Sequence, residues 1–86
     1  MSESLLEFPC QFPLKIMGVA TDGFAQTIAE VVVSHAPDFN PASMEMRPSS
    51  GGKYLALTCT ITATSQTQLD TLYRALSSHP MVKVVL

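Results

Sequence analysis

The stretch YLALTCTITA, residues 54–63, alternates strictly between two kinds of side chain. One set is apolar and large enough to fill a core: Leu55, Leu57, Cys59 and Ile61. The other set is small or carries a hydroxyl: Tyr54, Ala56, Thr58, Thr60 and Thr62. A period of two predicts a β-strand with one buried face and one open face. Such a strand needs partner strands on its edges and an apolar layer over its buried face.

Three further segments have the character of strands. FPLKIMG, residues 12–18, alternates with Phe12, Leu14 and Ile16 on one side. SMEMRP, residues 43–48, is shorter, and its Pro48 indicates an edge strand, where a missing N–H is tolerated. HPMVKVVL, residues 79–86, closes the chain, and its Val84 is predicted to join the buried side. The sequence therefore predicts four strands.

Two segments show helical spacing instead. In ATDGFAQTIAEVVVSHAP, residues 20–37, Thr21 or Asp22 is predicted to cap a helix that Pro37 ends. Its apolar stripe comprises Phe24, Ile28, Val31, Val32 and His35. In the second segment, Thr64 or Ser65 is the predicted cap. Its stripe comprises Leu69, Leu72, Tyr73 and Leu76.

The order strand, helix, strand, strand, helix, strand predicts an α+β fold, the βαββαβ ferredoxin-like plait. Right-handed crossovers give a four-stranded antiparallel sheet of order 4-1-3-2 with both helices on one face. Residues 12–86 form this single domain in the prediction. Residues 1–11 form an N-terminal tail, partly docked through Leu5, Leu6 and Phe8, because these side chains favour burial.

Composition narrows the classes of function. Of the 86 residues, 47% are hydrophobic and 14% charged, and the formal net charge is -2, so nucleic acid is not an expected partner. No apolar run is long enough for a membrane span, so a cytoplasmic location is expected without a membrane partner. Cys10 and Cys59 form no CxxC pair, and His35 and His79 lack ligand spacing, so neither a metal site nor a disulfide is predicted.

The loop RPSSGGK, residues 47–53, contains the glycines, hydroxyls and lysine that phosphate-binding loops also contain. A phosphate loop works by feeding a helix N-terminus, whereas this loop feeds the strand at 54–63. It is predicted to be a mobile hairpin loop in which Gly51 and Gly52 supply positive φ. No nucleophile, base and carboxylate pattern occurs elsewhere, so the sequence predicts neither an enzyme nor a cofactor.

Basic residues collect on the strand faces that point away from the helices. The predicted binding set comprises Lys15, Arg47, Lys53, Thr58, Thr60 and Lys83, with Lys83 beside Lys15 on the neighbouring strand. Glu45 is the one acid predicted on these faces. The set predicts a non-catalytic adaptor or regulatory module that binds a protein partner, acidic in character, through its open sheet face. A solvated face that serves solubility is the alternative interpretation.

Three stretches together resemble the YbeD-like family of small bacterial proteins. They are LLEFPCQFPLKIMG, RPSSGGKY and TITATSQTQLDTLYRALSSHPMVKVVL, within a similarity that runs from Leu5 to Leu86. The resemblance implies a ferredoxin-like fold similar to the ACT regulatory domain and assigns no activity. It also implies an alternative function, an ACT-type small-molecule sensor that binds its ligand at the turn around Gly18, Asp22 and Gly23. The proline of the typical ACT turn is missing here. ACT domains bind such ligands at subunit interfaces. For the open sheet face, the alternative partner is a second copy of the chain, which would make a homodimer.

Overall fold

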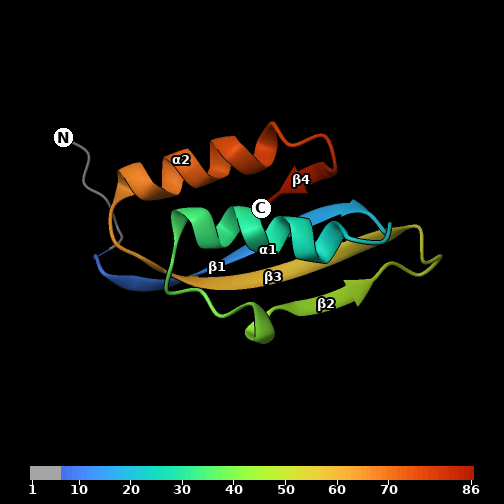
Figure 1. Ribbon diagram of the computed structural model, residues 1–86, viewed down its shortest axis with the longest axis horizontal. Coiled ribbons are helices and arrows are strands. Elements are labelled where there is room, and N and C mark those ends of the chain that lie inside the picture. The colour runs from blue at the N-terminus through green and yellow to red at the C-terminus, as the bar shows by residue number, and fades with distance from the viewer. Residues whose placement is uncertain (1–6) are drawn as a thin grey trace.

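A computed structural model describes residues 7–86 and has the predicted order of elements (Figure 1). The strands are β1 (Cys10–Val19), β2 (Glu45–Pro48), β3 (Tyr54–Ala63) and β4 (Val82–Val85). The helices are α1 (Phe24–His35), the short 3-10 helix η1 (Pro41–Ser43) and α2 (Gln66–Ser77). None of the helices in this described part is long and apolar enough to cross a membrane.

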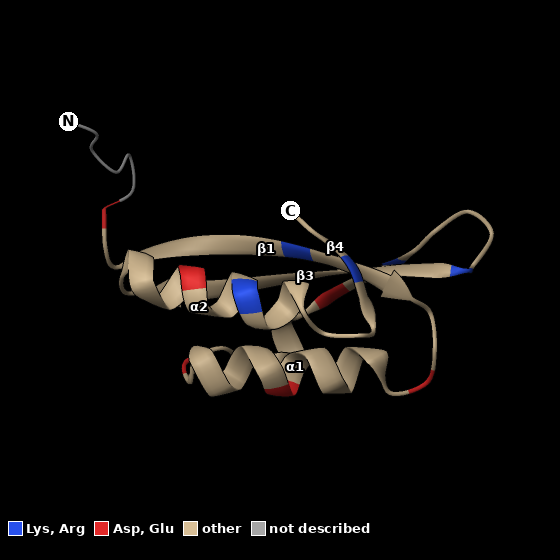
Figure 2. Ribbon diagram, turned by 90° about the horizontal axis from the view of Figure 1, so that it is seen from above, with Lys and Arg blue, Asp and Glu red and all other residues tan. Residues whose placement is uncertain are grey.

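The four strands form one antiparallel sheet in the order β2-β3-β1-β4, which is the predicted 4-1-3-2 order read from the other edge. The central pair, β1 and β3, stays in register over ten residue pairs, from Cys10 opposite Ala63 to Val19 opposite Tyr54. Both helices lie on the same side of this sheet (Figures 1 and 2). The α+β ferredoxin-like plait is therefore confirmed, and it leaves the other side of the sheet uncovered by helices.

The core lies between the sheet and the two helices. The largest side chains sealed in it are Phe24, Leu14, Ile16, Ile28, Leu57, Ile61, Leu69, Leu72 and Leu76. These residues come from the alternating strand positions and the helical stripes that the sequence identifies. Phe8 is partly buried and packs against the core, whereas Leu5 and Leu6 lie outside the described residues, so docking of the tail stays a prediction. β1 begins at Cys10, so its first two residues belong to the predicted tail.

The two long helices begin in different ways. At α2, Ser65 Oγ accepts from the Gln68 N–H (3.0 Å), and Gln68 Oε1 accepts from the Thr64 N–H (2.7 Å), which confirms a side-chain cap. At α1 the prediction of a Thr21 or Asp22 cap is wrong. The N-cap is Gly23, with φ 86° and no side-chain cap. The left-handed turn at this glycine lets the Thr21 carbonyl, rather than a side chain, accept from the Phe24 N–H (3.2 Å).

A β-bulge in β4 corrects two predictions. Val84 pairs with Met17 and Val82 with Gly18, so one step along β1 corresponds to two along β4, and Lys83 is the extra residue. On the β4 side, the neighbour of Lys15 is Leu86, whose N–H donates to the Lys15 carbonyl (2.8 Å). Lys83 therefore does not lie beside Lys15. Val84 is 44% exposed and is not a core residue. A strand this short shows too few alternations for the sequence to reveal the extra residue.

The loop between β2 and β3 is a hydrogen-bonded hairpin turn. The Ser49 N–H donates to the Tyr54 carbonyl (2.9 Å), and Ser49 Oγ accepts from the Tyr54 N–H (3.1 Å). Of the two loop glycines only Gly52, at φ 72°, has positive φ, so the prediction for Gly51 is wrong. The carbonyl of Lys53 accepts from the Ala20 N–H (2.9 Å), which ties the loop to the end of β1. Its predicted mobility stays a prediction.

Candidate protein-binding interface

The side of the sheet that faces away from the helices, here called the open face, brings together residues from all four strands. Register places Lys15 opposite Thr58, with Glu45 on the far side of Thr58 and Leu86 on the far side of Lys15. The next row across the sheet consists of Val84, Met17, Ala56 and Arg47. Val19 and Tyr54 form a third pair. Because side chains alternate along each strand, these rows project on the side opposite buried Leu14, Ile16, Leu57 and Cys59.

The centre of the open face is apolar. Four of the five large hydrophobic residues that are exposed in the described chain belong to it: Met17 at 38%, Val19 at 37%, Val84 at 44% and Leu86 at 69%. The bulge in β4 contributes to this, because it sets Val84 and Leu86 beside β1 where the sequence predicted Lys83. The open face is thus an apolar strip with charges on it, rather than the mainly basic and hydroxylated surface that was predicted.

The predicted cations lie around this strip at different distances from its centre. Lys15 and Arg47 line the same hollow, on β1 and β2 respectively. Lys53 Nζ lies 5.6 Å from the centre of the Tyr54 ring, within the range of a cation–π contact. Lys83, at the bulge, lines none of the hollows described below. Figure 2 shows most Lys and Arg positions along the strands and the β2–β3 loop, and most acidic positions on the helices and connections.

Three hollows in the open face meet at two residues, Met17 and Ala56. The largest, about 430 Å³, is also lined by Lys15, Glu45, Met46, Arg47, Thr58 and Leu86. A second, about 160 Å³, extends toward Tyr54 and Ser49, and a small third extends toward Val84. Ala56 is the smallest side chain in its row, so the surface dips above it. Thr58 lines the large hollow, whereas Thr60 is exposed outside it.

The hollow was not predicted from the sequence, whereas most of the charged residues on its rim were. The alternation at 54–63 already assigned Ala56 to the open face, but its neighbours Met17 and Arg47 come from distant parts of the chain. The dip depends on which residues flank Ala56 across the strands, and this requires the register. A small residue between larger ones on an otherwise alternating open face is the one signal the sequence contains.

The turn predicted as an alternative ligand site is packed at one end and exposed at the other. A Cβ added to Gly18 would clash with the Met81 carbonyl oxygen and with the Phe24 ring, so the core fills the space beside this glycine. Asp22 and Gly23 are exposed, and nothing lies within 4 Å of a Cβ built on Gly23. Gly18 is therefore packed against the core, whereas Asp22 and Gly23 lie on the surface.

The His35, His79 and Cys59 side chains are held by contacts that stabilise the fold. His35 Nδ1 lies 3.0 Å from the Val31 carbonyl, and His79 Nδ1 accepts from the Met81 N–H (3.1 Å). Burial raises the pKa of the Cys59 thiol to about 11, which keeps it protonated and a poor nucleophile. Within residues 7–86, no three His, Cys, Asp or Glu side chains come together as metal ligands could.

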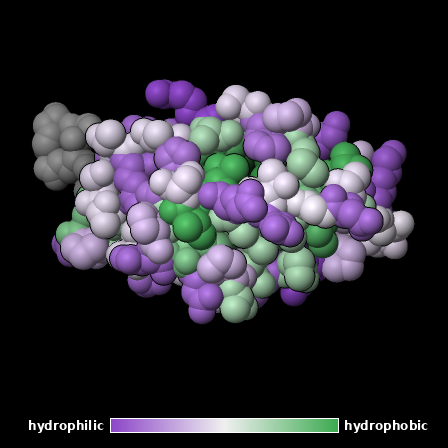
Figure 3. Space-filling model, in the orientation of Figure 1, coloured by the Kyte–Doolittle hydropathy of each residue, from purple (hydrophilic) through white to green (hydrophobic). Residues whose placement is uncertain are grey.

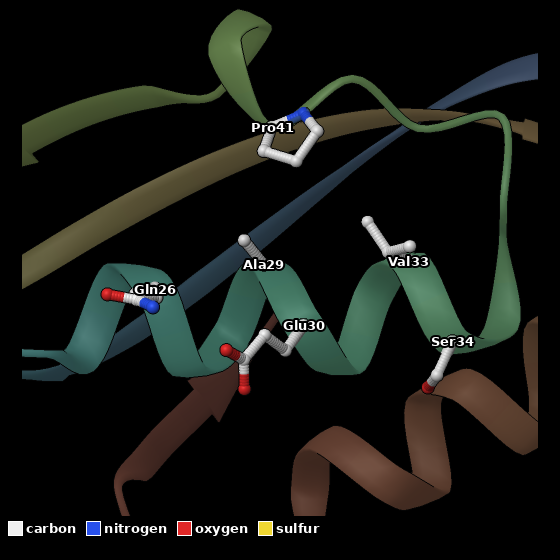
Figure 4. Close-up of a pocket in the computed structure, with 6 residues that line it drawn as sticks. All are labelled: Gln26, Ala29, Glu30, Val33, Ser34 and Pro41. Atoms are coloured by element: carbon white, nitrogen blue, oxygen red, sulfur yellow. The ribbon is translucent and has the colours of Figure 1, made fainter.

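A separate groove of about 410 Å³ runs along the outer flank of α1. Ala29 and Val33 point from the helix toward Pro41, while Glu30 and Ser34 point away from it (Figure 4). On this helix-covered side of the molecule, apolar side chains appear as separate spots among polar ones (Figure 3). The groove has one charged rim residue, Glu30, whereas the open face joins several charges to a continuous apolar strip.

Relatives of this chain span nearly its whole length. Residues 3–86 match the family model described as Protein of unknown function (DUF493). A UPF0250 protein of Janthinobacterium sp. (strain Marseille) is 61% identical, covering 99% of this chain and 93% of that protein. The UPF0250 protein NE1487 of Nitrosomonas europaea is 56% identical, covering 98% of this chain and 97% of that protein.

Solved structures with low sequence identity share the fold. The solution structure of HP0495 from Helicobacter pylori has a TM-score of 0.78 at 13% identity, covering 98% of this chain and 88% of that one. The ACT domain of GTP pyrophosphokinase from Chlorobium tepidum has a TM-score of 0.65 at 19% identity, covering 91% of this chain and 96% of that one. Together with the YbeD-like resemblance, which these relatives confirm, the matches establish that the chain belongs to the bacterial DUF493 (UPF0250) family and has an ACT-like, ferredoxin-like fold.

Proposed function

We propose that this protein is a non-catalytic adaptor or regulatory module of the bacterial cytoplasm, which binds an acidic protein partner through its open face. The observation that carries the proposal is the hollow of about 430 Å³ that has an apolar floor and has Lys15 and Arg47 on its rim. Protein interfaces combine an apolar, desolvated centre with a polar rim, and charges on the rim select the partner by sign. Exposed apolar strips on monomers commonly mark such sites.

The sign of the partner follows from the charges of the open face. Lys15 and Arg47 carry positive charge on it, and Lys53 lies beside it against the Tyr54 ring. Glu45 carries the one negative side-chain charge among the residues defined above. A second copy of the chain would place two positive surfaces against each other, which is unfavourable. Carboxylates instead form charge-assisted hydrogen bonds with Lys and Arg, which are about twice as strong as neutral ones. An acidic partner therefore fits better than a homodimer through this face.

A site-specific photo-crosslinker tests the proposal in the producing cell. Benzoylphenylalanine replaces Thr58, which lines the hollow, or Thr71, an exposed position on α2. We expect Thr58→benzoylphenylalanine to yield a protein adduct that the Thr71 variant does not yield. Adding Arg47→Glu should abolish the adduct, while Arg74→Glu, a charge reversal on α2, should not. Identical adducts at both positions, or an adduct insensitive to Arg47→Glu, would refute binding through the open face.

The small-molecule sensor has weaker support. Its basis is the structural likeness to an ACT domain at 19% identity, which concerns the fold alone. The packing of Met81 and Phe24 against Gly18 explains that glycine without a ligand. No hollow described above is lined by Gly18, Asp22 or Gly23.

A further inference from the structure

We propose that the hollow above Ala56 is the anchor pocket of this interface, and that it receives one bulky apolar side chain of a partner peptide flanked on both sides by carboxylates. The inference rests on the proposed function and specifies its ligand: an acidic peptide segment with a central apolar anchor. It is argued from the shape of the open face, from the arrangement of its charges and from the register of its strands.

The shape of the pocket follows from the row Val84, Met17, Ala56, Arg47. Neighbouring strands lie about 4.8 Å apart, so Met17 and Arg47 stand roughly 10 Å from each other across β3. Between them is only the methyl group of Ala56, and all three hollows include it. The side chains of Met17 and Arg47 form two walls, and the methyl group of Ala56 forms the floor between them. Leu86 adds a third apolar wall in the largest hollow.

The part of the lining around Ala56 suits an apolar side chain. The largest hollow, about 430 Å³, lies at the lower end of the range of small-molecule pockets, roughly 300–1,000 Å³. Its floor and walls offer methyl, thioether and aliphatic atoms from Ala56, Met17 and Leu86. A methionine wall adapts to anchors of different shape, because the side chain is flexible and polarizable. Interfaces typically concentrate their binding energy in such a central anchor.

The charges give the direction and the pattern of the bound segment. Lys15 is on β1 and Arg47 is on β2, and β3 with Ala56 lies between these two strands. A peptide that crosses β3 above Ala56 therefore passes one cation before its anchor and the other after it. Glu45 shares the row of Lys15 and repels a carboxylate at that corner. The matching segment has one acid on each side of the anchor, rather than a long acidic run.

A peptide library displayed on phage, with twelve random residues, provides the test. The folded full-length protein is the bait, and selected peptides are synthesised and titrated by fluorescence anisotropy. We expect the enriched peptides to share an apolar or aromatic residue flanked by Asp or Glu. Replacing the anchor by Ala, or both acids by Lys, should weaken binding about tenfold or more.

Filling the pocket is the matching change on the protein. Ala56→Ile closes the hollow with a residue that strands favour and leaves every charge unchanged. Thr62→Ile, on the same face of β3 but outside the hollows, is the control. We expect Ala56→Ile to weaken peptide binding about tenfold or more, and Thr62→Ile to leave it within about twofold. Thermal unfolding checks that each variant is folded, and Ala56→Val replaces Ala56→Ile if the larger residue prevents folding.

The outcomes separate this inference from the proposed function. Peptides that bind Ala56→Ile as tightly as the unchanged protein, or that lack either acids or an anchor, overturn the anchor pocket. So does a library that yields no enriched peptide. If the Thr58 crosslink depends on Arg47 in those cases, the acidic interface stands without this pocket. If that crosslink is also absent, both proposals fail.

Discussion

Gly18 belongs to the turn that was predicted as an alternative ligand site, but the packing around it explains why this residue is a glycine. The Met81 carbonyl and the Phe24 ring occupy the space where any side chain would begin. We expect Gly18→Ala to lower the free energy of unfolding by about 1–3 kcal/mol, because an extra atom in a filled site forces its neighbours apart. Gly51→Ala, with open space around it, should stay within about 0.5 kcal/mol. Urea unfolding measures both. A Gly18→Ala protein as stable as the Gly51→Ala control would contradict the packing role.

Cys59 gives a pH dependence whose sign follows from burial. Its pKa is raised from the ordinary value of 9.0 to about 11 because the buried thiolate would lose its hydration. Below pH 9 both the folded and the unfolded state keep the proton, so Cys59 adds no slope. Above pH 9 the unfolded state loses the proton first, and stability falls, by about 1 kcal/mol at pH 10.

The control for this effect is Cys59→Ala, which removes the thiol and keeps the other titrating groups. Urea unfolding at several pH values should show a shallower loss of stability between pH 9 and 10 in Cys59→Ala than in the unchanged protein. Equal slopes in the two proteins would show that the Cys59 thiol titrates alike in both states.

At the scale of the element, the two helix starts offer a direct comparison. Ser65 caps α2 through the Gln68 N–H, whereas Asp22, an equally plausible cap by sequence, makes no cap at α1. We expect Ser65→Ala to cost about 1 kcal/mol and Asp22→Ala to cost less than about 0.5 kcal/mol. Chemical denaturation of the two variants side by side is the measurement. An Asp22→Ala protein that loses as much stability as Ser65→Ala would contradict the glycine start of α1.

The strands and helices were predictable because each has a local signature. Alternation identified β3 from the ten residues 54–63 and β1 from the seven residues 12–18, and helical spacing placed Phe24, Ile28 and Leu72 in the core. The bulge in β4 has no such signature, because a strand of four residues shows too little alternation to reveal one extra residue. The neighbours of Lys15 and the environment of Val84 were therefore predicted wrongly.

At the scale of the whole molecule, the open face depends on contacts between distant segments. Its cations Lys15 and Arg47 could be assigned to one side of the sheet from alternation alone. Its hollow could not, because Met17, Ala56 and Leu86 become neighbours only through strand pairing. The sequence thus predicted which charged residues lie on the open face better than it predicted the shape of that face. We propose that an acidic partner is held at the rim of this apolar hollow.

The most direct test measures how tightly the crosslinked partner binds three charge-reversal variants of this protein. The measurement is calorimetry across a salt series. We expect Lys15→Glu and Arg47→Glu each to weaken binding about tenfold or more at low salt and to flatten its salt dependence. Arg74→Glu changes the net charge equally but lies on α2, and it should leave the affinity within about twofold. Equal affinities for all three variants, with the same salt dependence as the unchanged protein, would contradict binding through the open face.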